Sequence, residues 1–401
     1  MYIGPVKTGT TSVQLNILNN KQFRKTLEED DNYQIISLGG FRKIGRLRDS
    51  CFKKQERDSN CKENIQSFSR MLDDAYDIAM SKYHNDFNQE FITLHPVETW
   101  SDVNLNDFNL QIMYDLFHKW DLHIVMFYRP YADWIASWYA QKLGAIFRYF
   151  RGYTAHKRVE PITKFLDTNK DNTLFHGTMG NYAFYEALLA KMNLPNHSSF
   201  SDYGNRIQVL NMHSLHGVEK EFINYLPHAN STKQRMKTLE NRSKDVFKIQ
   251  NAADGKHILG SVLMVHAWRK EMVSIGPENG GKRLEEALRH ANITEDDLPQ
   301  ICLTGSQEEL VWQRHLLNHK RFAPMFESEI DAEDVLRKSF DEKKRKRCSV
   351  DGERAVQMKE VKKIFQNCVF HSQYHIKADL AETDREDLAW IKLGCNKTQH
   401  S

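Results

Sequence analysis

The residues at the start of the chain are of the types that bind a phosphate group. The stretch GPVKTGTTSVQ follows an apolar MYI strand and leads into apolar positions at helical spacing. The first N–H groups of a helix point outward at the positive end of the helix dipole, so an anion binds there readily. Gly4 and Gly9 let the backbone approach the anion, and Lys7 adds a mobile positive charge. The candidate binding residues are Lys7, Thr8, Gly9, Thr10, Thr11 and Ser12.

The order of residues in this loop differs from that of the nucleotide-hydrolysing P-loop. The Walker A pattern places Lys after the second glycine, whereas here Lys7 precedes Gly9. A magnesium-dependent nucleotidase also needs an acidic residue at the end of a neighbouring strand. The expected strands instead run into Gly39, His95, Arg129 and His213. Both features disfavour hydrolysis of ATP or GTP.

A second basic position follows the apolar run HIVMFY at 123–128. Arg129 comes directly after this run, and α/β proteins bind ligands at the carboxyl ends of their parallel strands. Pro130 suits the first turn of a helix. Ser137 lies seven residues further on, which places Pro130 and Ser137 on one helix face. Arg129 and Ser137 therefore form a second candidate phosphate site.

These two motifs resemble those of the sulfotransferase family, carbohydrate-type, over residues 1–225. The resemblance implies an α/β, P-loop-like three-layer fold with a central mainly parallel sheet. It implies 3′-phosphoadenosine 5′-phosphosulfate (PAPS) as the donor, no metal, and a hydroxyl of a carbohydrate or glycan as the acceptor. In that family pattern Lys7 stabilises the charge that develops on the leaving phosphate. Arg129 and Ser137 take the positions that hold the 3′-phosphate.

The resemblance also implies a base that takes the proton of the acceptor hydroxyl. Carbohydrate sulfotransferases carry a Glu two residues before an aromatic residue, and Glu98 and Trp100 have this spacing. Cytosolic members use a His followed shortly by Pro, and His95–Pro96 resembles that form. The stretch FITLHPVETW departs from both patterns, so Glu98 and His95 are both candidates, and Glu98 is favoured.

Two other functions are open on the sequence alone. One is a P-loop kinase or nucleotidase, which the position of Lys7 and the strand ends disfavour. The other is a non-catalytic relative that binds a nucleotide or a glycan. A sulfotransferase is expected to bind adenosine 3′,5′-bisphosphate without magnesium, whereas a kinase is expected to prefer ATP with magnesium.

Short apolar runs alternate with helix-like segments in the first half of the chain. Strands are expected at 33–38, 91–94, 123–128 and 207–212, in addition to MYI. Helices are expected at 12–20, 64–83, 107–120, 180–192 and 217–226. In 64–83 the apolar residues recur at the helical period. This alternation predicts a mainly parallel sheet with helices on both faces.

Residues 226–401 are expected to form a mainly helical C-terminal extension, packed on the same domain as the 1–225 core. GPENGGKR (276–283) has the composition of a flexible loop, and GGKR within it is a candidate nucleotide-binding loop. The run DEKKRKRC (341–348) is interpreted as a solvated helix face or loop. A further basic group is either ordinary solvated charge or a patch for an acidic glycan. It consists of Arg148, Arg151, His156, Lys157 and Arg158.

The composition is that of a globular protein, and nothing in it points to nucleic acid. The 401 residues include 40% hydrophobic and 27% charged residues, with a net charge of +3. No stretch approaches the roughly 18 apolar residues of a transmembrane segment. Met1 lies close to the Gly-Pro turn, so any membrane anchor is expected upstream of it. Six cysteines and the sequons at Asn196, Asn230, Asn241, Asn292 and Asn396 favour the Golgi lumen or secretory pathway.

Overall fold

The protein is mostly helical and carries a small parallel sheet, which is compatible with the predicted α/β class. The computed structural model describes residues 2–3, 13–35, 46–52, 57–82, 92–94, 96–97, 106–149, 159–171, 178–195, 205–212, 217–226, 228–242, 258–273, 277–325 and 332–367. The helices, strands and cores of the fold are those of these residues.

Four parallel strands form the main sheet, in the order β4-β1-β5-β6. They are β1 (Tyr2–Ile3), β4 (Pro96–Val97), β5 (Ile124–Tyr128) and β6 (Ile207–Asn211). Strand β1 pairs with β5 at Tyr2 and Val125, and with β4 at Ile3 and Val97. Strands β2 (Tyr33–Ile35) and β3 (Ile92–Leu94) form a second parallel pair. The expected strands at 33–38, 91–94, 123–128 and 207–212 are thus confirmed.

Strand β5 is buried along its whole length because side chains pack against both of its faces. Ile124, Met126 and Tyr128 lie in one apolar core, and Val125 and Phe127 lie in another. Successive side chains of a strand point to opposite faces, so each face of the sheet has its own core. A strand buried on both faces needs a continuous apolar run, and IVMFY is such a run.

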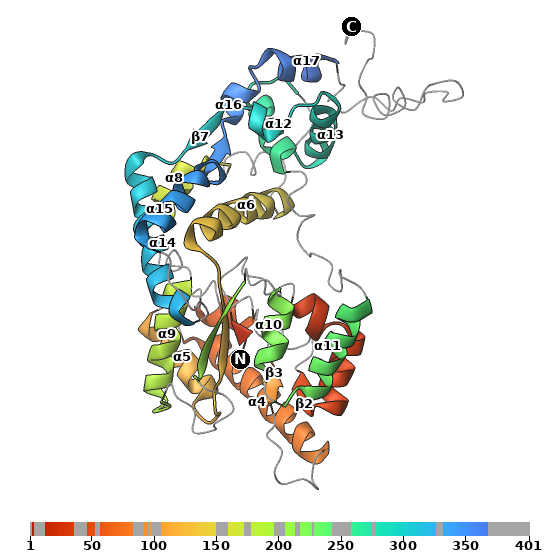
Figure 1. Cartoon of the computed structure of the whole chain (residues 1–401), viewed down its shortest axis with the longest axis vertical. Coiled ribbons are helices and arrows are strands. Elements are labelled where there is room, and N and C mark those ends of the chain that lie inside the picture. Colours follow the sequence, from red (N-terminus) through yellow and green to blue (C-terminus); the bar gives the residue numbers. More distant parts are fainter. Residues whose placement is uncertain are drawn as a thin grey trace, which may run out of the picture. The chain divides into compact units, whose positions relative to one another are not determined.

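Different helices contribute to the two cores, and Figure 1 shows α5 and α9 on one side of the strands and α10 on the other. The first core takes side chains from α4 (Ser59–Lys82), α5 (Asp107–Phe117) and α9 (Thr178–Lys191). The second takes them from η1 (Gln14–Leu18), α2 (Lys21–Lys25), η2 (Thr26–Asp30), α10 (Val218–Tyr225) and α11 (Asn230–Arg242). A helix is therefore present at each of the five expected positions in this part of the chain.

The chain divides into two compact units, each made of three segments. Unit 1 comprises Met1–Trp134, Lys170–Gln250 and Trp312–Leu336, and unit 2 comprises Ile135–Asn169, Asn251–Val311 and Arg337–Ser401. Helices α6 (Tyr131–Tyr149), α14 (Gly305–Phe322) and α15 (Glu333–Glu342) contribute residues to both units. The division into a 1–225 core and a 226–401 extension stays a prediction.

Unit 2 is built from helices and one antiparallel pair of short strands. Its other elements are α8 (Ile162–Asn169), α12 (Ile258–Arg269), α13 (Pro277–His290), β7 (Gln300–Cys302), η8 (Lys344–Arg347), β8 (Cys348–Val350), α16 (Gly352–Ala355) and α17 (Lys359–Asn367). Helices α12 and α13 approach very closely, since a Cβ atom on Gly260 would overlap the carbonyl oxygen of Gly281. Glycine permits this contact because it has no side chain.

The expected loop at GPENGGKR is wrong, because Pro277–His290 form helix α13. Proline is tolerated at the first helical position, so Pro277 does not prevent a helix. Gly281 lies in the close contact with α12 and not in a turn. The GGKR residues therefore do not form a nucleotide-binding loop.

The short strands β7 and β8 were not expected, because three residues carry too little alternation to predict a strand.

Candidate functional site

Three neighbouring strands of the main sheet lead into segments that carry predicted site residues. Strands β4, β1 and β5 are adjacent and parallel, so their carboxyl ends lie at one edge of the sheet. The candidate phosphate loop follows β1, Glu98 follows β4, and Arg129 follows β5. The following candidates lie outside the described residues: Lys7, Thr8, Gly9, Thr10, Thr11, Ser12, His95 and Glu98. The topology thus brings the starting points of three candidate segments together.

The segments on both sides of the candidate phosphate loop are anchored. Before the loop, Ile3 pairs with Val97 of the neighbouring strand. After it, Val13 and Ile17 are fully buried in the second core. The chain therefore passes from the middle of a parallel sheet into a packed helical segment, as the strand–loop–helix interpretation requires.

Arg129 is half-buried directly after β5. Burial lowers the pKa of its guanidinium, and the carboxylate of Asp133 acts in the opposite direction. An arginine stays charged at any physiological pH, so a partly desolvated cation stands at the end of the strand. The carbonyl oxygen of Pro130 accepts the N–H groups of Asp133 and Trp134, each at 3.0 Å, and so starts α6 directly after Arg129. This is a suitable setting for a side chain that binds an anion.

Ser137 lies in helix α6 and is half-buried. Helix α6 is continuous from Tyr131 to Tyr149, so the helical spacing expected between Pro130 and Ser137 is present. The division of the chain assigns Arg129 to unit 1 and Ser137 to unit 2. Their joint role in binding a 3′-phosphate stays a prediction.

Side chains of α14 reach the first turns of two helices in unit 1. The Nδ1 atom of His315 accepts the backbone N–H of Ala132 at 3.5 Å, and Oδ1 of Asn318 accepts that of Met179 at 3.2 Å. Ala132 belongs to the first turn of α6, and Met179 to that of α9. No sequence pattern points to these contacts, because the partners are 183 and 139 residues apart.

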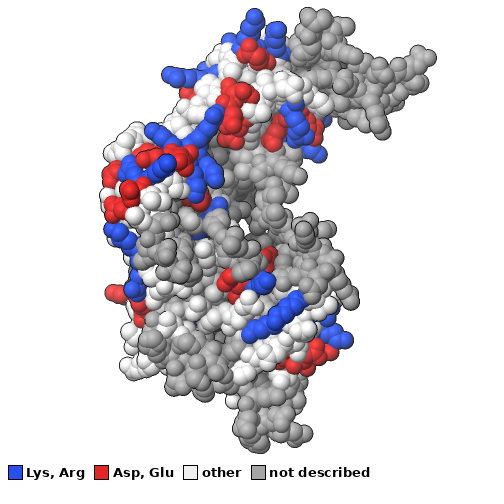
Figure 2. Space-filling model, in the orientation of Figure 1, with Lys and Arg blue, Asp and Glu red and all other residues white. Residues whose placement is uncertain are grey.

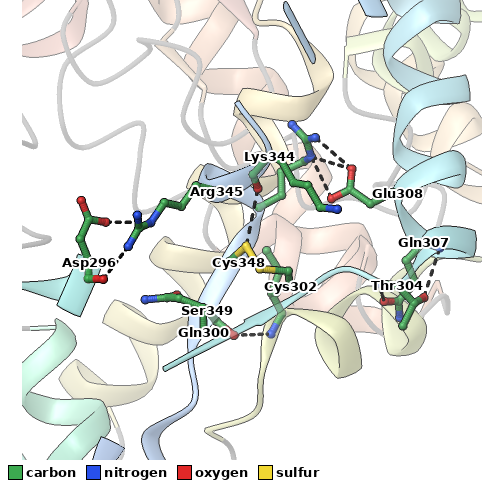
Figure 3. Close-up of a disulfide and its surroundings, with 12 residues drawn as sticks. Asp296, Gln300, Cys302, Thr304, Gln307, Glu308, Lys344, Arg345, Cys348 and Ser349 are labelled. Carbon is green, nitrogen blue, oxygen red and sulfur yellow. Dashed lines mark hydrogen bonds and ion pairs between the residues drawn. A yellow bond between two sulfur atoms is a disulfide. The ribbon is translucent and has the colours of Figure 1, made fainter. Parts of the chain in front are cut away.

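The basic run at 341–348 is only partly a solvated surface. Lys344 and Lys346 are exposed, as expected. Arg345 is also exposed and pairs with Asp296, with 3.0 Å between Nε and Oδ1, and Figure 3 shows the two side chains facing each other. Arg347 is buried and binds the carboxylate of Glu308 through Nη2 at 2.9 Å. The interpretation as a solvated segment is therefore wrong for Arg347.

Lys and Arg side chains are mixed with Asp and Glu side chains on the described part of the face that Figure 2 shows. Arg337 contacts Glu309 at 3.1 Å and Asp341 at 3.3 Å, and Lys320 contacts Glu333 at 3.1 Å. The basic group that is either solvated charge or a glycan patch lies outside the described residues: the side chain of Arg148, and Arg151, His156, Lys157 and Arg158. The described surface around these ion pairs therefore has mixed charge rather than a field of one sign.

Four of the six cysteines form two disulfides, Cys51–Cys61 and Cys302–Cys348. Cys302 and Cys348 lie directly opposite each other on β7 and β8, and Figure 3 shows their disulfide. Cys368 and Cys395 lie outside the described residues.

Within the described ranges no helix has the length and apolar character needed to cross a membrane. Over the same part of the chain, no group of three or more His, Cys, Asp or Glu side chains could hold a metal ion.

Comparisons with family models, with curated proteins and with solved structures found no match to this chain. A functional assignment therefore depends on the residues and the topology described above.

Proposed function

We propose that the protein is a sulfotransferase that transfers the sulfuryl group of PAPS to a hydroxyl of a carbohydrate acceptor. The order β4-β1-β5 is the observation that carries this proposal. A donor with a 5′-phosphosulfate and a 3′-phosphate needs two cationic sites, and the acceptor hydroxyl needs a base close to the sulfur atom. The segments that carry Glu98, Lys7 and Arg129 start from three adjacent strand ends, where α/β proteins bind their ligands.

The proposed fold is the P-loop-like, three-layer arrangement. Its support is a parallel sheet with a separate apolar core on each face, and a first strand that leads through a Gly- and Thr-rich loop into a packed helical segment. In this arrangement the loop wraps the phosphate that leaves during transfer. The position of Lys7 ahead of Gly9 favours a sulfuryl donor over a nucleotide that is hydrolysed with magnesium.

The proposed reaction is an in-line displacement at sulfur. The acceptor oxygen forms a bond to sulfur while the bond between sulfur and the 5′-phosphate oxygen breaks. The hydroxyl proton goes to a base on the protein, and the electron pair of the broken bond stays on the phosphate of adenosine 3′,5′-bisphosphate. Lys7 and the N–H groups of the loop stabilise that negative charge, and Arg129 with Ser137 holds the 3′-phosphate.

Glu98 is the preferred base, and His95 is the second candidate. Glu98 directly follows β4, whose carboxyl end lies beside that of β1. His95 precedes β4 and follows β3. The preference for Glu98 rests on its place after the strand that neighbours the phosphate loop, since the base must approach the sulfur atom from the acceptor side.

Calorimetric titration with adenosine 3′,5′-bisphosphate in the presence of EDTA tests the donor site. We expect binding without magnesium, and weaker binding to Arg129→Ala by about 1.5–3 kcal/mol, because a charged hydrogen bond is lost. Arg70→Ala removes an exposed arginine from α4 and serves as the matched control with unchanged affinity. Tighter binding of ATP with magnesium would instead assign the protein to the kinases or nucleotidases.

Sulfate transfer from PAPS to a panel of neutral and acidic glycans tests the base. Glu98→Gln keeps the shape of the side chain and removes the base, so turnover should fall about 10²- to 10⁴-fold with donor binding intact. Lys7→Ala should also act mainly on turnover. His95→Asn should cost far less than Glu98→Gln. A larger loss at His95 would reverse the assignment of the base.

We also propose that the protein functions in the Golgi lumen or elsewhere in the secretory pathway. Two disulfides are typical of an oxidising compartment. Two of the sequon asparagines, Asn230 and Asn292, are exposed. Glycosidase treatment of the protein from its native source should lower its mass. Two reduced cysteine pairs and an unchanged mass would contradict this location.

A further inference from the structure

The C-terminal half of α14 is part of unit 1 and packs at the carboxyl end of β5. The ring of Phe322 lies 5.7 Å from that of Tyr128, the last residue of β5, and 5.5 Å from that of Tyr182 on α9. His315 lies seven residues before Phe322 on the same helix and therefore on the same face. This face of α14 thus runs from the end of β5 to the start of α6.

The residue at the N-cap of helix α6 is a proline, which cannot cap the helix with its side chain. Pro130 accepts the first intrahelical hydrogen bonds through its carbonyl oxygen, so it occupies the N-cap position. A proline side chain has no atom that accepts a hydrogen bond, whereas a typical N-cap residue accepts the N–H of the second or third helical residue. The N–H of Ala132, the second helical residue, is bound instead by Nδ1 of His315. His315 therefore supplies the cap that Pro130 lacks.

This contact lies three residues from Arg129. Arg314, beside His315, adds a second link to the same turn, with 3.4 Å between its Nη1 atom and the hydroxyl of Tyr131. Pro130 is the one residue between Arg129 and this turn along the chain, and its ring limits the backbone torsion at the junction. An anchored first turn therefore limits the directions in which the guanidinium of Arg129 can point.

We propose that His315 is a positioning residue of the anion site at Arg129, acting through the first turn of α6. The inference deepens the proposed function and rests on it. His315 accepts a hydrogen bond through Nδ1, so the proton of its neutral ring lies on Nε2. The residue contacts the helix and not the nucleotide. Its effect is on the 3′-phosphate, because Arg129 is the group that it orients.

Asn318 makes a closely related contact in the same helix and serves as the matched control. Its Oδ1 atom accepts the N–H of Met179 in the first turn of α9, and its amide donates to the carbonyl of Arg314 at 2.9 Å. Both His315 and Asn318 are buried, so replacing either disturbs packing to a similar extent. Asn318 caps α9, which begins far from Arg129 in the chain.

The experiment compares the Kd of adenosine 3′,5′-bisphosphate with that of adenosine 5′-monophosphate, which lacks the 3′-phosphate. His315→Leu should weaken binding of the bisphosphate about three- to tenfold, as expected for one lost capping bond, and leave the monophosphate unchanged. His315→Asn keeps an acceptor near the position of Nδ1 and should bind both nucleotides within about twofold of the wild type. Asn318→Leu should leave the ratio of the two Kd values unchanged.

A further variant guards against misfolding of His315→Leu. The amide of His315→Gln reaches the position of Nε2 rather than that of Nδ1, so it keeps the volume of the side chain and removes the acceptor. It should show the same loss for the bisphosphate, and faster amide exchange at 131–134. An unchanged Kd ratio in the Leu and Gln variants, or an equal change in Asn318→Leu, would overturn the role of His315. A wild-type protein that binds both nucleotides equally would overturn the proposed function itself.

Discussion

The two units use their buried polar groups in different ways. In unit 1 polar side chains cap the ends of helices around a parallel sheet, and several strands lead into segments that carry candidate site residues. In unit 2 the buried charge of Arg347 is neutralised by Glu308, and its guanidinium carbon lies 3.7 Å from the centre of the Phe340 ring. A buried cation held in this way has a structural role within unit 2.

A cavity in unit 2 is also lined by charged side chains that pair with one another. Unit 2 has a shallow cavity of about 530 Å³, lined by Lys270, Asp351, Glu353, Arg354, Gln357 and Met358. Lys270 pairs with Glu353 at 3.3 Å, and Arg354 with Asp351 at 3.5 Å. These side chains pair with one another, as Arg347 and Glu308 do. We therefore test unit 1 for ligand binding and catalysis, and we test unit 2 for the stability that its paired charges provide.

The largest effect is expected from breaking the buried ion pair of unit 2. The side chain of Arg347 is 1% exposed and that of Glu308 is 11% exposed, so Arg347→Met leaves a buried carboxylate without its countercharge. The free energy of unfolding of unit 2 should fall by about 3–5 kcal/mol. Amide exchange measured by mass spectrometry should rise in η8 and in the first half of α14.

The double variant Arg347→Met/Glu308→Leu is the control for this prediction. It removes both charges together and should recover most of the lost stability. Exchange in β5 and β6 should stay at the wild-type rate in both variants. An equal rise in β5 would contradict the separation of the two units in stability.

The two disulfides allow the units to be compared directly, since each unit contains one. Cys302–Cys348 joins residues 46 positions apart in unit 2, and Cys51–Cys61 joins residues 10 apart in unit 1. On the loop-entropy model, replacing both cysteines by serine should cost about 4 kcal/mol for the longer loop and about 3 kcal/mol for the shorter one. Thermal unfolding of the two double variants shows which disulfide contributes more to stability. A greater loss of stability for the Cys51–Cys61 variant would show that loop length does not determine how much each disulfide stabilises the protein.

A smaller effect is expected from removing a long-range cap in unit 1. The buried carboxylate of Asp31 accepts the N–H groups of Ser231 and Thr232, each at 2.8 Å, at the start of α11. Asp31→Ala should lower the free energy of unfolding of unit 1 by about 1–2 kcal/mol. Asp30→Ala changes the exposed neighbouring carboxylate and should stay within about 0.5 kcal/mol of the wild type. Urea unfolding followed by amide exchange in α11 distinguishes these outcomes.

The smallest effect concerns the pH dependence of unit 2, where two groups act in opposite directions. Burial lowers the pKa of His266 from 6.5 to about 4, and Arg269 adds to this shift. Between these values the unfolded chain binds more protons, so this histidine makes stability rise as the pH rises. Burial raises the pKa of Glu285 from 4.5 to about 7. In that range the folded chain binds more protons, so this carboxyl makes stability fall as the pH rises.

Single variants separate the two contributions. His266→Gln leaves the effect of Glu285, so unit 2 should become less stable from pH 5 to pH 7. Glu285→Gln leaves the effect of His266, so unit 2 should become more stable from pH 5 to pH 6.5. The urea midpoint measured for α12 and α13 by amide exchange reports both slopes. Equal slopes in the two variants would contradict the assignment to these residues.

Local patterns in the sequence were sufficient to predict most elements of unit 1. The run IVMFY was expected to be a buried strand, and DFNLQIMYDLF was expected to be a helix. Both predictions depend only on residues close together in the chain. The same reasoning was wrong for GPENGGKR, because Gly281 lies in a close contact with another helix.

What the sequence could establish was the chemical character of short segments: a loop with Lys7 and hydroxyl groups, an arginine directly after an apolar strand, and a Glu ahead of an aromatic residue. The side-by-side position of β4, β1 and β5, and the contact between His315 and Ala132, appear only when the chain is folded. The physical reason is the distance along the chain over which each kind of interaction acts. Periodicity and capping rules describe interactions within a few residues, whereas strand order and caps from distant helices depend on which apolar faces pack together.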